Sequence, residues 1–125
     1  MQEELSVLGQ KVSGGSQIDY DLIIIGAGPA GMSAALCARR AELNVLLIDR
    51  NLPGGEAATA YKINNYLGFP SGILGSDLSK AMEQHIEDYN VEYSCESVED
   101  IFDHDQAIKT VVTDLGHKYR TKAIV

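Results

Sequence analysis

The amino-acid sequence predicts an α/β domain that is built on a parallel βαβ unit and continues into a small antiparallel β-meander. Two apolar strands flank a glycine turn and an alanine-rich helix within roughly 30 residues, which is the length of one βαβ unit. A later stretch alternates apolar and polar residues around a turn, which is typical of antiparallel strands. Residues 1–18 precede this pattern and contain Ser-Gly-Gly-Ser, so we expect a tail or linker there.

The βαβ unit begins with a strand over Asp21–Ile25. This run is continuously apolar after its first residue, as expected for a strand that is buried on both faces of a parallel sheet. Pro29 is tolerated in a first helical turn, so we expect a helix from Pro29 to about Ala41. Residues Asn44–Asp49 then form the second buried strand, and the connection between the two strands is expected to be right-handed.

The region after the second strand divides into three parts. Residues 53–75 are rich in glycine and small side chains, and a loop of this length is usually functional or disordered. Ser76 is expected to cap a helix that runs to about Tyr89, whose apolar stripe is formed by Leu78, Met82, Ile86 and Tyr89. Residues 91–125 predict the meander, with strands in VEYSCESV, DQAIKTVVTD and HKYRTKAIV and a hairpin turn at 114–117.

The charge balance of the chain indicates which classes of binding partner are unsuitable. The chain has 10 basic and 18 acidic residues, a net charge of −8, and no basic stripe, which argues against nucleic acid and anionic membranes as partners. The longest apolar run near the N-terminus, Leu22–Ile25, is too short for a signal peptide or a membrane-spanning helix. We therefore expect a cytoplasmic protein.

Cysteine and histidine give little indication of chemistry in this chain. Cys37 and Cys95 are far apart, no CxxC pair is present, and each is expected to be a small buried side chain. The three histidines, His85, His104 and His117, lack ligand spacing and are expected on the surface. We therefore predict no metal site and no catalytic residue within the chain.

The sequence IIIGAGPAGMSAAL carries the chemistry. Gly26, Gly28 and Gly31 form G-x-G-x-x-G between a strand and a helix, which is the context that gives this motif meaning. The first glycine permits a tight turn, the second lets a pyrophosphate approach the backbone, and the third lets the helix pack on the strand. The helix that starts with Pro29 and Ala30 then presents N–H groups and a partial positive charge to the phosphates.

Asp49 completes the pattern of a Rossmann-like dinucleotide site. It ends the second strand, 18 residues after Gly31, where a carboxylate can accept hydrogen bonds from ribose hydroxyls. A carboxylate at this position would repel the 2′-phosphate of NADP. The adjacent Arg50 is expected to point to solvent. This motif does not distinguish FAD from NAD.

Three segments together resemble a known family. YDLIIIGAGPAGMSAALCARRAELNVLLIDR, PGG at 53–55 and INNYLGFP at 63–70 are similar to the N-terminal part of the thioredoxin reductase family of flavoproteins. The resemblance covers residues 19–125. The closing KYRTKAIV resembles the strand that runs into the second flavin-contacting motif of that family.

The resemblance implies FAD as the cofactor and assigns its contacts. The pyrophosphate would lie at Gly26–Gly31 and the ribose on Asp49, where the family often carries Glu. The Gly54–Gly55 turn and Asn65 would lie near the flavin, and the main chain near Ser97 and Val98 would pass the adenine. Glu56 replaces a Gln of the family and cannot donate the amide hydrogen bond of a Gln. The complete set of expected contacts is Gly26, Gly28, Pro29, Ala30, Gly31, Asp49, Arg50, Gly54, Gly55, Glu56, Asn65, Ser97 and Val98.

The resemblance also implies the wider function. Residues 19–125 would be an incomplete, N-terminal portion of a FAD-binding domain, inactive alone. The remainder of the flavoenzyme would carry the cysteine pair that receives electrons from FAD. The electron donor would be NADPH or another carrier, the substrate a thioredoxin-like protein or another disulfide, and the assembly a homodimer. Two alternatives stay open: a fragment of an NAD-dependent dehydrogenase, which leaves PGG and INNYLGFP unexplained, and a non-catalytic dinucleotide-binding module.

Overall fold

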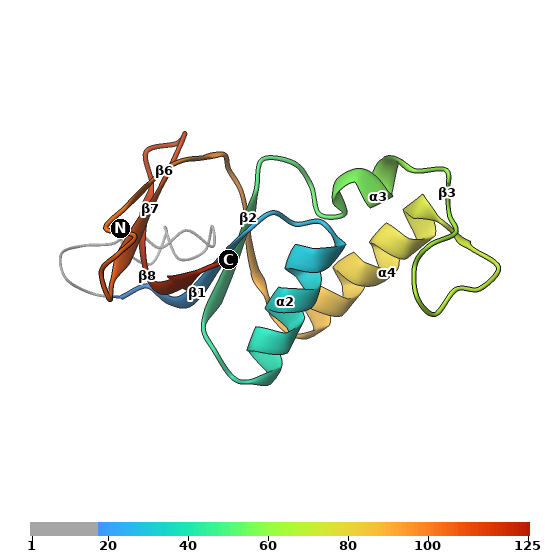
Figure 1. The fold of residues 1–125 in the computed structure, drawn as a ribbon, viewed down its shortest axis with the longest axis horizontal. Coiled ribbons are helices and arrows are strands. Elements are labelled where there is room, and N and C mark those ends of the chain that lie inside the picture. Colours follow the sequence, from blue (N-terminus) through green and yellow to red (C-terminus); the bar gives the residue numbers. More distant parts are fainter. Residues whose placement is uncertain (1–17) are drawn as a thin grey trace.

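A six-stranded mixed sheet organises the computed structural model, which describes residues 18–125. The strands lie in the order β5-β2-β1-β8-β7-β6, and a separate two-stranded sheet pairs β3 with β4. Figure 1 shows the helices on one side of β1 and β2 and the meander on the other. The elements are β1 (Tyr20–Ile25), α2 (Pro29–Arg40), β2 (Val45–Asp49), α3 (Gly55–Thr59), β3 (Lys62–Ile63), β4 (Ile73–Leu74), α4 (Gly75–Asp88), β5 (Glu92–Cys95), β6 (Val98–Phe102), β7 (Lys109–Thr113) and β8 (Lys118–Ile124).

The predicted βαβ unit is confirmed. Strand β1 pairs in parallel with β2, with Ile23 opposite Leu46 and Ile24 opposite Leu47. Helix α2 connects the two strands and begins at Pro29 as expected. On its other side β1 pairs in parallel with β8, so the first strand lies at the centre of the parallel part of the sheet. The predicted tail, except Ile18, lies outside the described residues.

Both faces of β1 and β2 are buried, because successive side chains of a strand point to opposite faces. On one face Ile24 and Leu47 pack against α2 and α4, in a cluster completed by Ala27, Met32, Ala35, Ala38, Val45 and Ile86. On the other face Ile23 and Leu46 pack against the meander, in a cluster completed by Tyr20, Ile48, Val111 and Tyr119. The meander thus covers the sheet face that the helices leave open.

The expected antiparallel meander is correct only from Val98 onward. Residues Glu92–Cys95 form β5, which pairs in parallel with β2 and extends the parallel sheet. Strands β6, β7 and β8 then form the antiparallel meander. The predicted turn at 114–117 joins β7 to β8, and Gly116 adopts a φ of 80° there. An alternating pattern does not specify which strand becomes the partner, and β5 docks where the sheet has a free edge.

The glycine-rich region 53–75 forms short elements rather than a plain loop. It contains the five-residue helix α3 and the β3–β4 hairpin. Helix α4 begins at Gly75, so the prediction of Ser76 as its cap is wrong. A Cβ atom built on Gly75 would lie 2.0 Å from the carbonyl oxygen of Ala60, which explains the glycine at this contact. Leu78 and Ile86 are buried as expected, whereas Tyr89 is 39% exposed.

Two expectations about single side chains are wrong. Cys37 on α2 and Cys95 at the end of β5 are exposed thiols rather than buried ones. His117 is not a free surface histidine, because its Nδ1 lies 2.5 Å from the carboxylate of Glu96 and its side chain is 19% exposed. Strand β5 is an edge strand, which explains why Cys95 remains accessible.

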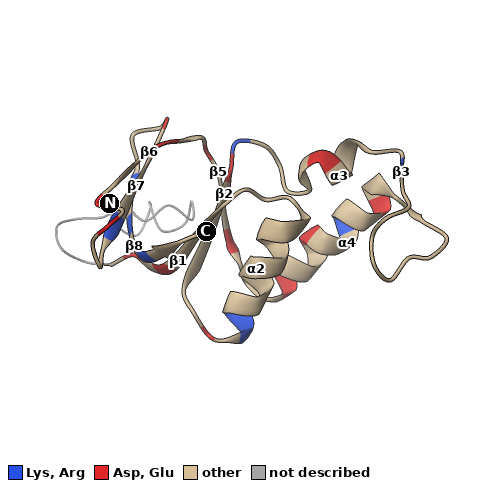
Figure 2. Ribbon diagram, viewed as in Figure 1, with Lys and Arg blue, Asp and Glu red and all other residues tan. Residues whose placement is uncertain are grey.

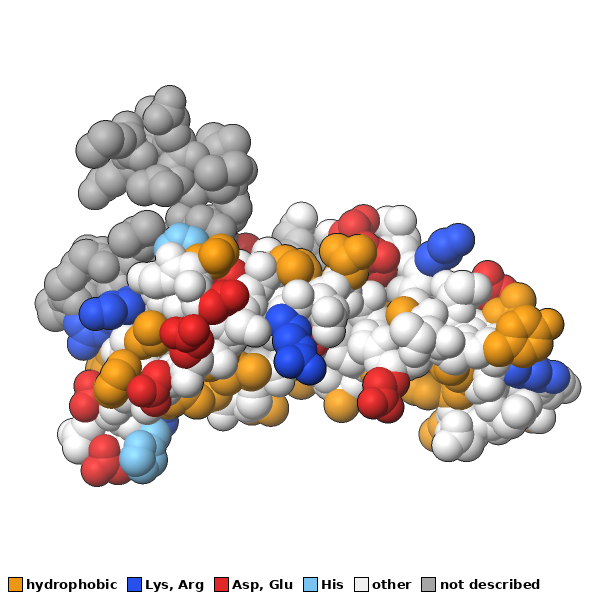
Figure 3. Space-filling view, turned by 90° about the horizontal axis from the view of Figure 1, so that it is seen from above, with side chains coloured by type: hydrophobic (Ala, Val, Ile, Leu, Met, Phe, Trp, Pro, Cys, Tyr) orange, Lys and Arg blue, Asp and Glu red, His pale blue; other side chains and the backbone are white. Residues whose placement is uncertain are grey.

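Charged side chains are spread over the molecule. Basic side chains lie among acidic and neutral ones along the ribbon and on the face seen in space-filling view (Figures 2 and 3). Arg39 and Arg40 lie in the last turn of α2, where a positive charge suits the helix dipole. Among the helices of residues 18–125, none has the length and apolar character needed to cross a bilayer.

A buried polar cluster around Glu96 ties β5 to the meander. The Glu96 carboxylate accepts hydrogen bonds from Thr113 Oγ1 and Tyr119 OH, each at 2.7 Å, from His117 Nδ1, and from Ser94 Oγ. Burial opposes ionisation of Glu96, but these hydrogen bonds outweigh burial and hold its pKa below the ordinary value. The pKa of Tyr119 shifts in the opposite direction: burial and the neighbouring Glu96 carboxylate together raise it above the ordinary value.

Glu96→Gln should lower the free energy of unfolding at neutral pH by on the order of 1–3 kcal/mol, because it removes a buried charged acceptor. A lowered pKa in the folded state contributes stability above the unfolded-state pKa, about 4.3, and this contribution is lost as pH falls through the folded-state pKa. The difference between parent and variant should therefore shrink between neutral and acidic pH. Urea denaturation at a series of pH values measures it.

The matched control is Glu99→Gln, which neutralises an exposed carboxylate on β6, the next strand along the chain. It should leave the free energy of unfolding within about 0.5 kcal/mol of the parent value. An unchanged gap between the parent and Glu96→Gln across the pH series would contradict the ionised state assigned to Glu96.

Candidate functional site

Four strands of the sheet run parallel to one another: β1, β2, β5 and β8. Their carboxyl ends meet along one edge of the sheet. Ligands of open α/β sheets bind at such an edge. Two cavities, of about 350 and 260 Å³, lie there, and Ile25 and Gly26 line both of them. The larger is the glycine cavity, lined further by Ile24, Gly28, Pro29, Ala30, Gly31 and Val125. The smaller is the Asp49 cavity, lined further by Ile48, Asp49, Arg50, Glu96, Ser97 and Val98.

The glycine turn has the geometry that its motif predicts. A Cβ atom on Gly31 would lie 1.7 Å from the carbonyl oxygen of Gly26, so only glycine lets α2 approach the end of β1 this closely. Gly26 itself has a φ of 112°, in the region that favours glycine. By contrast, a Cβ on Gly28 would meet no atom within 4 Å and would enter open space. The Gly28 side of the turn is therefore free for a ligand to approach the backbone.

The first turn of α2 faces the glycine cavity. Met32 N–H donates to the carbonyl oxygen of Gly28, which closes the first turn. Helix geometry leaves the N–H groups of Ala30 and Gly31 without an intrahelical acceptor, and Pro29 carries no N–H group. Both residues line the glycine cavity, so two donors and the positive end of the helix dipole are available to an anion there.

Asp49 joins the end of β2 to the glycine turn. Its Oδ2 accepts a hydrogen bond from Ala27 N–H at 2.8 Å, and its Oδ1 accepts one from Asn51 N–H at 2.9 Å. Each carboxylate oxygen has a second lone pair, so Asp49 can still accept hydrogen bonds from hydroxyl groups of a ligand. The residue therefore both orders the turn and lines the cavity.

The Gly54–Gly55 turn packs directly on the glycine motif. Gly54 N–H donates to the carbonyl oxygen of Ala27 at 2.8 Å. A Cβ on Gly55 would lie 3.0 Å from the Cα of Gly28, and Gly55 has a φ of 56°. These contacts bring two glycine-rich segments together that are more than twenty residues apart in the chain.

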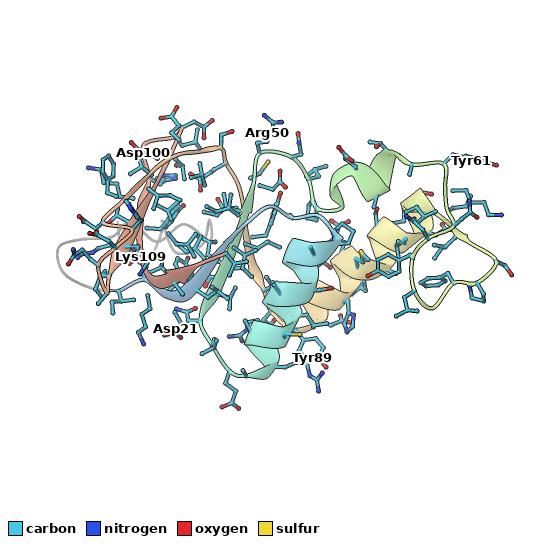
Figure 4. All side chains as sticks on the ribbon, viewed as in Figure 1. Asp21, Arg50, Tyr61, Tyr89, Asp100 and Lys109 are labelled. Carbon is cyan, nitrogen blue, oxygen red and sulfur yellow. The ribbon has the colours of Figure 1, made fainter. Side chains whose placement is uncertain are left out.

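Arg50, Ser97 and Val98 form the outer part of the Asp49 cavity. Figure 4 shows the Arg50 side chain pointing away from the ribbon at the end of β2, consistent with its exposure. Ser97 N–H donates to Asp114 Oδ1 at 3.0 Å, which fixes the main chain of this wall. Val98 packs against the core cluster between the sheet and the meander.

Four predicted site residues do not line these cavities. Gly54 and Gly55 contact the glycine motif instead, whereas Glu56 and Asn65 lie further away. Glu56 is exposed in the first turn of α3, and Asn65 is exposed between β3 and β4. Within residues 18–125, neither side chain lines the glycine cavity or the Asp49 cavity. The neighbour of Asn65, Tyr66, instead lines a cavity of about 220 Å³ between α2 and α4, together with Pro29.

Glu96 is the polar residue in the lining of the two cavities that the sequence analysis did not identify. It lines the Asp49 cavity, yet its side chain is only 1% exposed. A single Glu in an alternating stretch is indistinguishable from a solvent-facing strand residue, so no local signal identifies it. Its donors, Ser94, Thr113, His117 and Tyr119, come from three strands and a turn, and only the folded chain brings them together.

The chain is similar to known proteins over nearly all of its described length. A sequence model of the pyridine nucleotide-disulphide oxidoreductase family matches residues 20–125. The thioredoxin reductase of Bacillus subtilis is 41% identical over 106 residues, which cover 85% of this chain and 33% of that protein. The chain therefore spans about a third of the length of this curated relative.

Solved structures agree with this assignment. The thioredoxin reductase of Lactococcus lactis has a TM-score of 0.78 and 39% identity, over 84% of this chain and 34% of that one. A ferredoxin-flavin thioredoxin reductase from Clostridium acetobutylicum has a TM-score of 0.73 and 28% identity, over 84% of this chain and 36% of that one. The α/β fold predicted from the sequence is confirmed, and the chain belongs to the pyridine nucleotide-disulphide oxidoreductase family, with thioredoxin reductases among its relatives.

Proposed function

We propose that this chain binds FAD and forms the N-terminal portion of the FAD-binding domain of a thioredoxin-reductase-like oxidoreductase. The observation that carries the proposal is the pair of cavities that adjoin at Ile25 and Gly26. An elongated ligand with phosphates on the glycine turn and a ribose at Asp49 matches this arrangement. The open space beside Gly28 supports a fit, because a side chain there would occupy the position of the ligand.

FAD is favoured over NAD by the second glycine turn and by the relatives. The Gly54–Gly55 turn lies against Gly28, in the sequence PGG that also supported the family resemblance. The relatives are named as thioredoxin reductases, and one of them is named as a flavin enzyme. An NAD site would use the same G-x-G-x-x-G but has no requirement for this second turn.

The roles of the residues follow from their chemistry. The N–H groups of Ala30 and Gly31 and the dipole of α2 would hold the pyrophosphate, and Asp49 would accept hydrogen bonds from the ribose. Arg50, Ser97 and Val98 would enclose the adenosine, and Gly54, Gly55, Glu56 and Asn65 would lie toward the flavin. FAD itself supplies the ability to take up electrons and pass them on.

The activity of the whole protein is part of this proposal. Electrons would pass from FAD to a cysteine pair outside this chain, because Cys37 and Cys95 lie on different elements as free thiols. NADPH is the first candidate donor, and the ferredoxin-flavin relative supports another carrier as the second. A thioredoxin-like protein is the expected substrate, in a cytoplasmic homodimer together with the rest of the flavoenzyme.

A visible absorption spectrum of the purified protein, whose mass has been checked, tests the proposal. We expect the absorption bands of an oxidised flavin, and FAD as the molecule released on denaturation. A folded protein that releases NAD instead would favour a nicotinamide enzyme. A folded protein that takes up neither FAD nor NAD when they are added would contradict dinucleotide binding altogether.

Gly28→Val should abolish FAD binding while the protein still folds. The backbone of Gly28 has φ −77° and ψ −175°, which valine adopts readily, and its Cβ would project into open space. Gly116→Ala is the opposite control: its φ of 80° should cost about 1 kcal/mol of stability while FAD binding stays intact. Flavin absorption and thermal unfolding of both variants give the comparison. A flavin-loaded Gly28→Val protein would place the site elsewhere.

Asp49→Ala should weaken FAD binding by about 1.5–3 kcal/mol, because it removes charge-assisted hydrogen bonds to the ribose. Asp21→Asn is the control, since Asp21 also accepts from a backbone N–H group, that of Asn44, but does not line either cavity. The Asp21 variant should retain the parent affinity. Titration of apoprotein with FAD, followed by flavin fluorescence, measures both. Parent-like affinity of Asp49→Ala would remove Asp49 from the ribose site.

A further inference from the structure

One wall of the Asp49 cavity is held in place by a network of buried hydrogen bonds. This wall, the 96–98 segment, follows directly after β5. Its main chain is held at two points: Glu96 N–H donates to the carbonyl oxygen of Asp49 at 2.9 Å, and Ser97 exchanges hydrogen bonds with Asp114. In that exchange Ser97 N–H donates to Asp114 Oδ1, and Asp114 N–H donates to the Ser97 carbonyl oxygen. The position of the wall therefore depends on the turn between β7 and β8.

The Glu96 side chain contributes the largest set of hydrogen bonds that hold the 96–98 segment. An ionised carboxylate offers about four acceptor sites. Four side chains donate to this one: Ser94, Thr113, His117 and Tyr119. No acceptor site then remains for a ligand, and the side chain is 1% exposed. Glu96 can act on a bound molecule only by fixing the backbone of the 96–98 segment.

The positions of the four donors show which elements the 96–98 segment is bonded to. Ser94 belongs to β5 itself, Thr113 is the last residue of β7, and His117 and Tyr119 stand at the turn and in β8. The carboxylate thus connects the end of the parallel strand β5 to both arms of the antiparallel hairpin. Strand β6 begins at Val98, so this same wall holds the passage from β5, at one edge of the sheet, to β6, at the other.

A buried charged side chain contributes little net stability to the folded state. Burying a carboxylate is costly, and replacing buried ionic groups by apolar side chains of similar volume is often neutral or stabilising. What a fully bonded carboxylate provides is one defined arrangement of the groups around it. Here the arrangement that it defines is one wall of a cavity.

We propose that Glu96 is a positioning residue for the adenosine half of the cofactor, which holds the 96–98 segment against the β7–β8 hairpin so that the Asp49 cavity keeps its shape. The inference rests on the proposed function, because it takes the Asp49 cavity as the adenosine site. It adds a determinant whose hydrogen-bond donors lie outside the cavity lining and come mainly from the meander. Adenosine affinity is therefore set partly by residues 113–119, which line neither cavity.

The test uses two probes, FAD and AMP, with the purified apoprotein. AMP carries the adenosine and one phosphate but no flavin, so it reports on the Asp49 cavity without the flavin contacts. Glu96→Ala should raise the Kd of both probes by about tenfold or more, as expected when one charged hydrogen-bonded group no longer fixes a site. Glu96→Gln should give an intermediate Kd, because its amide oxygen still accepts from some of the four donors.

Glu92 provides the matched control on the same strand. Its carboxylate accepts a hydrogen bond from Tyr20 OH at 2.6 Å, at the opposite end of β5 from the cavity. Glu92→Gln and Glu92→Ala should lower the thermal unfolding temperature and leave both Kd values unchanged. Equal losses of affinity in the Glu92 and Glu96 variants would overturn the positioning role, since general loosening of the sheet would then explain both.

The remaining outcomes separate this inference from the proposed function. If the parent protein binds FAD and AMP and the Glu96 variants bind them with parent affinity, the positioning role is wrong and the proposed function stands. If the folded parent binds neither probe, the proposed function fails and the inference fails with it. Should Glu96→Ala not fold, Tyr119→Phe and Thr113→Val each remove one donor with little change in volume, and parent-like Kd values in both would overturn the proposal.

Discussion

The contact between Gly31 and Gly26 is the constraint on which the rest of the site depends. Because no side chain separates the two backbones, α2 starts within van der Waals distance of the end of β1. This close start directs the free N–H groups of the helix toward the edge of the sheet. It also leaves space beside Gly28, where Gly55 closes the turn from the other side. A larger residue at position 31 would move the helix, and the cavity would lose its anion-binding end.

The sequence predicted the parts of the fold that local physics determines. The apolar runs of β1 and β2 are long enough to require burial on both faces, and the three glycines and Pro29 specify the turn and the helix start. Asp49 was identifiable because its spacing from Gly31 is tied to the length of one helix and one strand. The location of β5 was not identifiable, since a strand of four residues can pair with any open edge.

The errors have a shared physical origin in contacts between distant residues. Cys95 is exposed because β5 is an edge strand, and His117 is partly buried because it bonds to Glu96, which lies 21 residues earlier, directly after β5. Gly75 starts α4 because its backbone packs on the carbonyl groups of Ala57 and Ala60, and this contact overrides the capping preference of Ser76. None of these partners is close in sequence, so no motif or periodicity records them. The cavity wall at residues 96–98 belongs to the same class.

Strands β1 and β8 pair in the sheet although they are the first and last described strands of the chain, so the sheet cannot be completed until the end of this sequence is available. Strand β1 is among the first described elements to leave the ribosome, yet one of its two partners is the last, and the bond from Arg120 N–H to Asp19 spans 101 residues. Closing a loop of this size costs entropy before the pairing can repay it. Val125 lines the glycine cavity and exchanges hydrogen bonds with Ile23 and Ile25. A nascent chain can therefore form the βαβ unit early, but the glycine cavity is complete only once residues 118–125 have been synthesised.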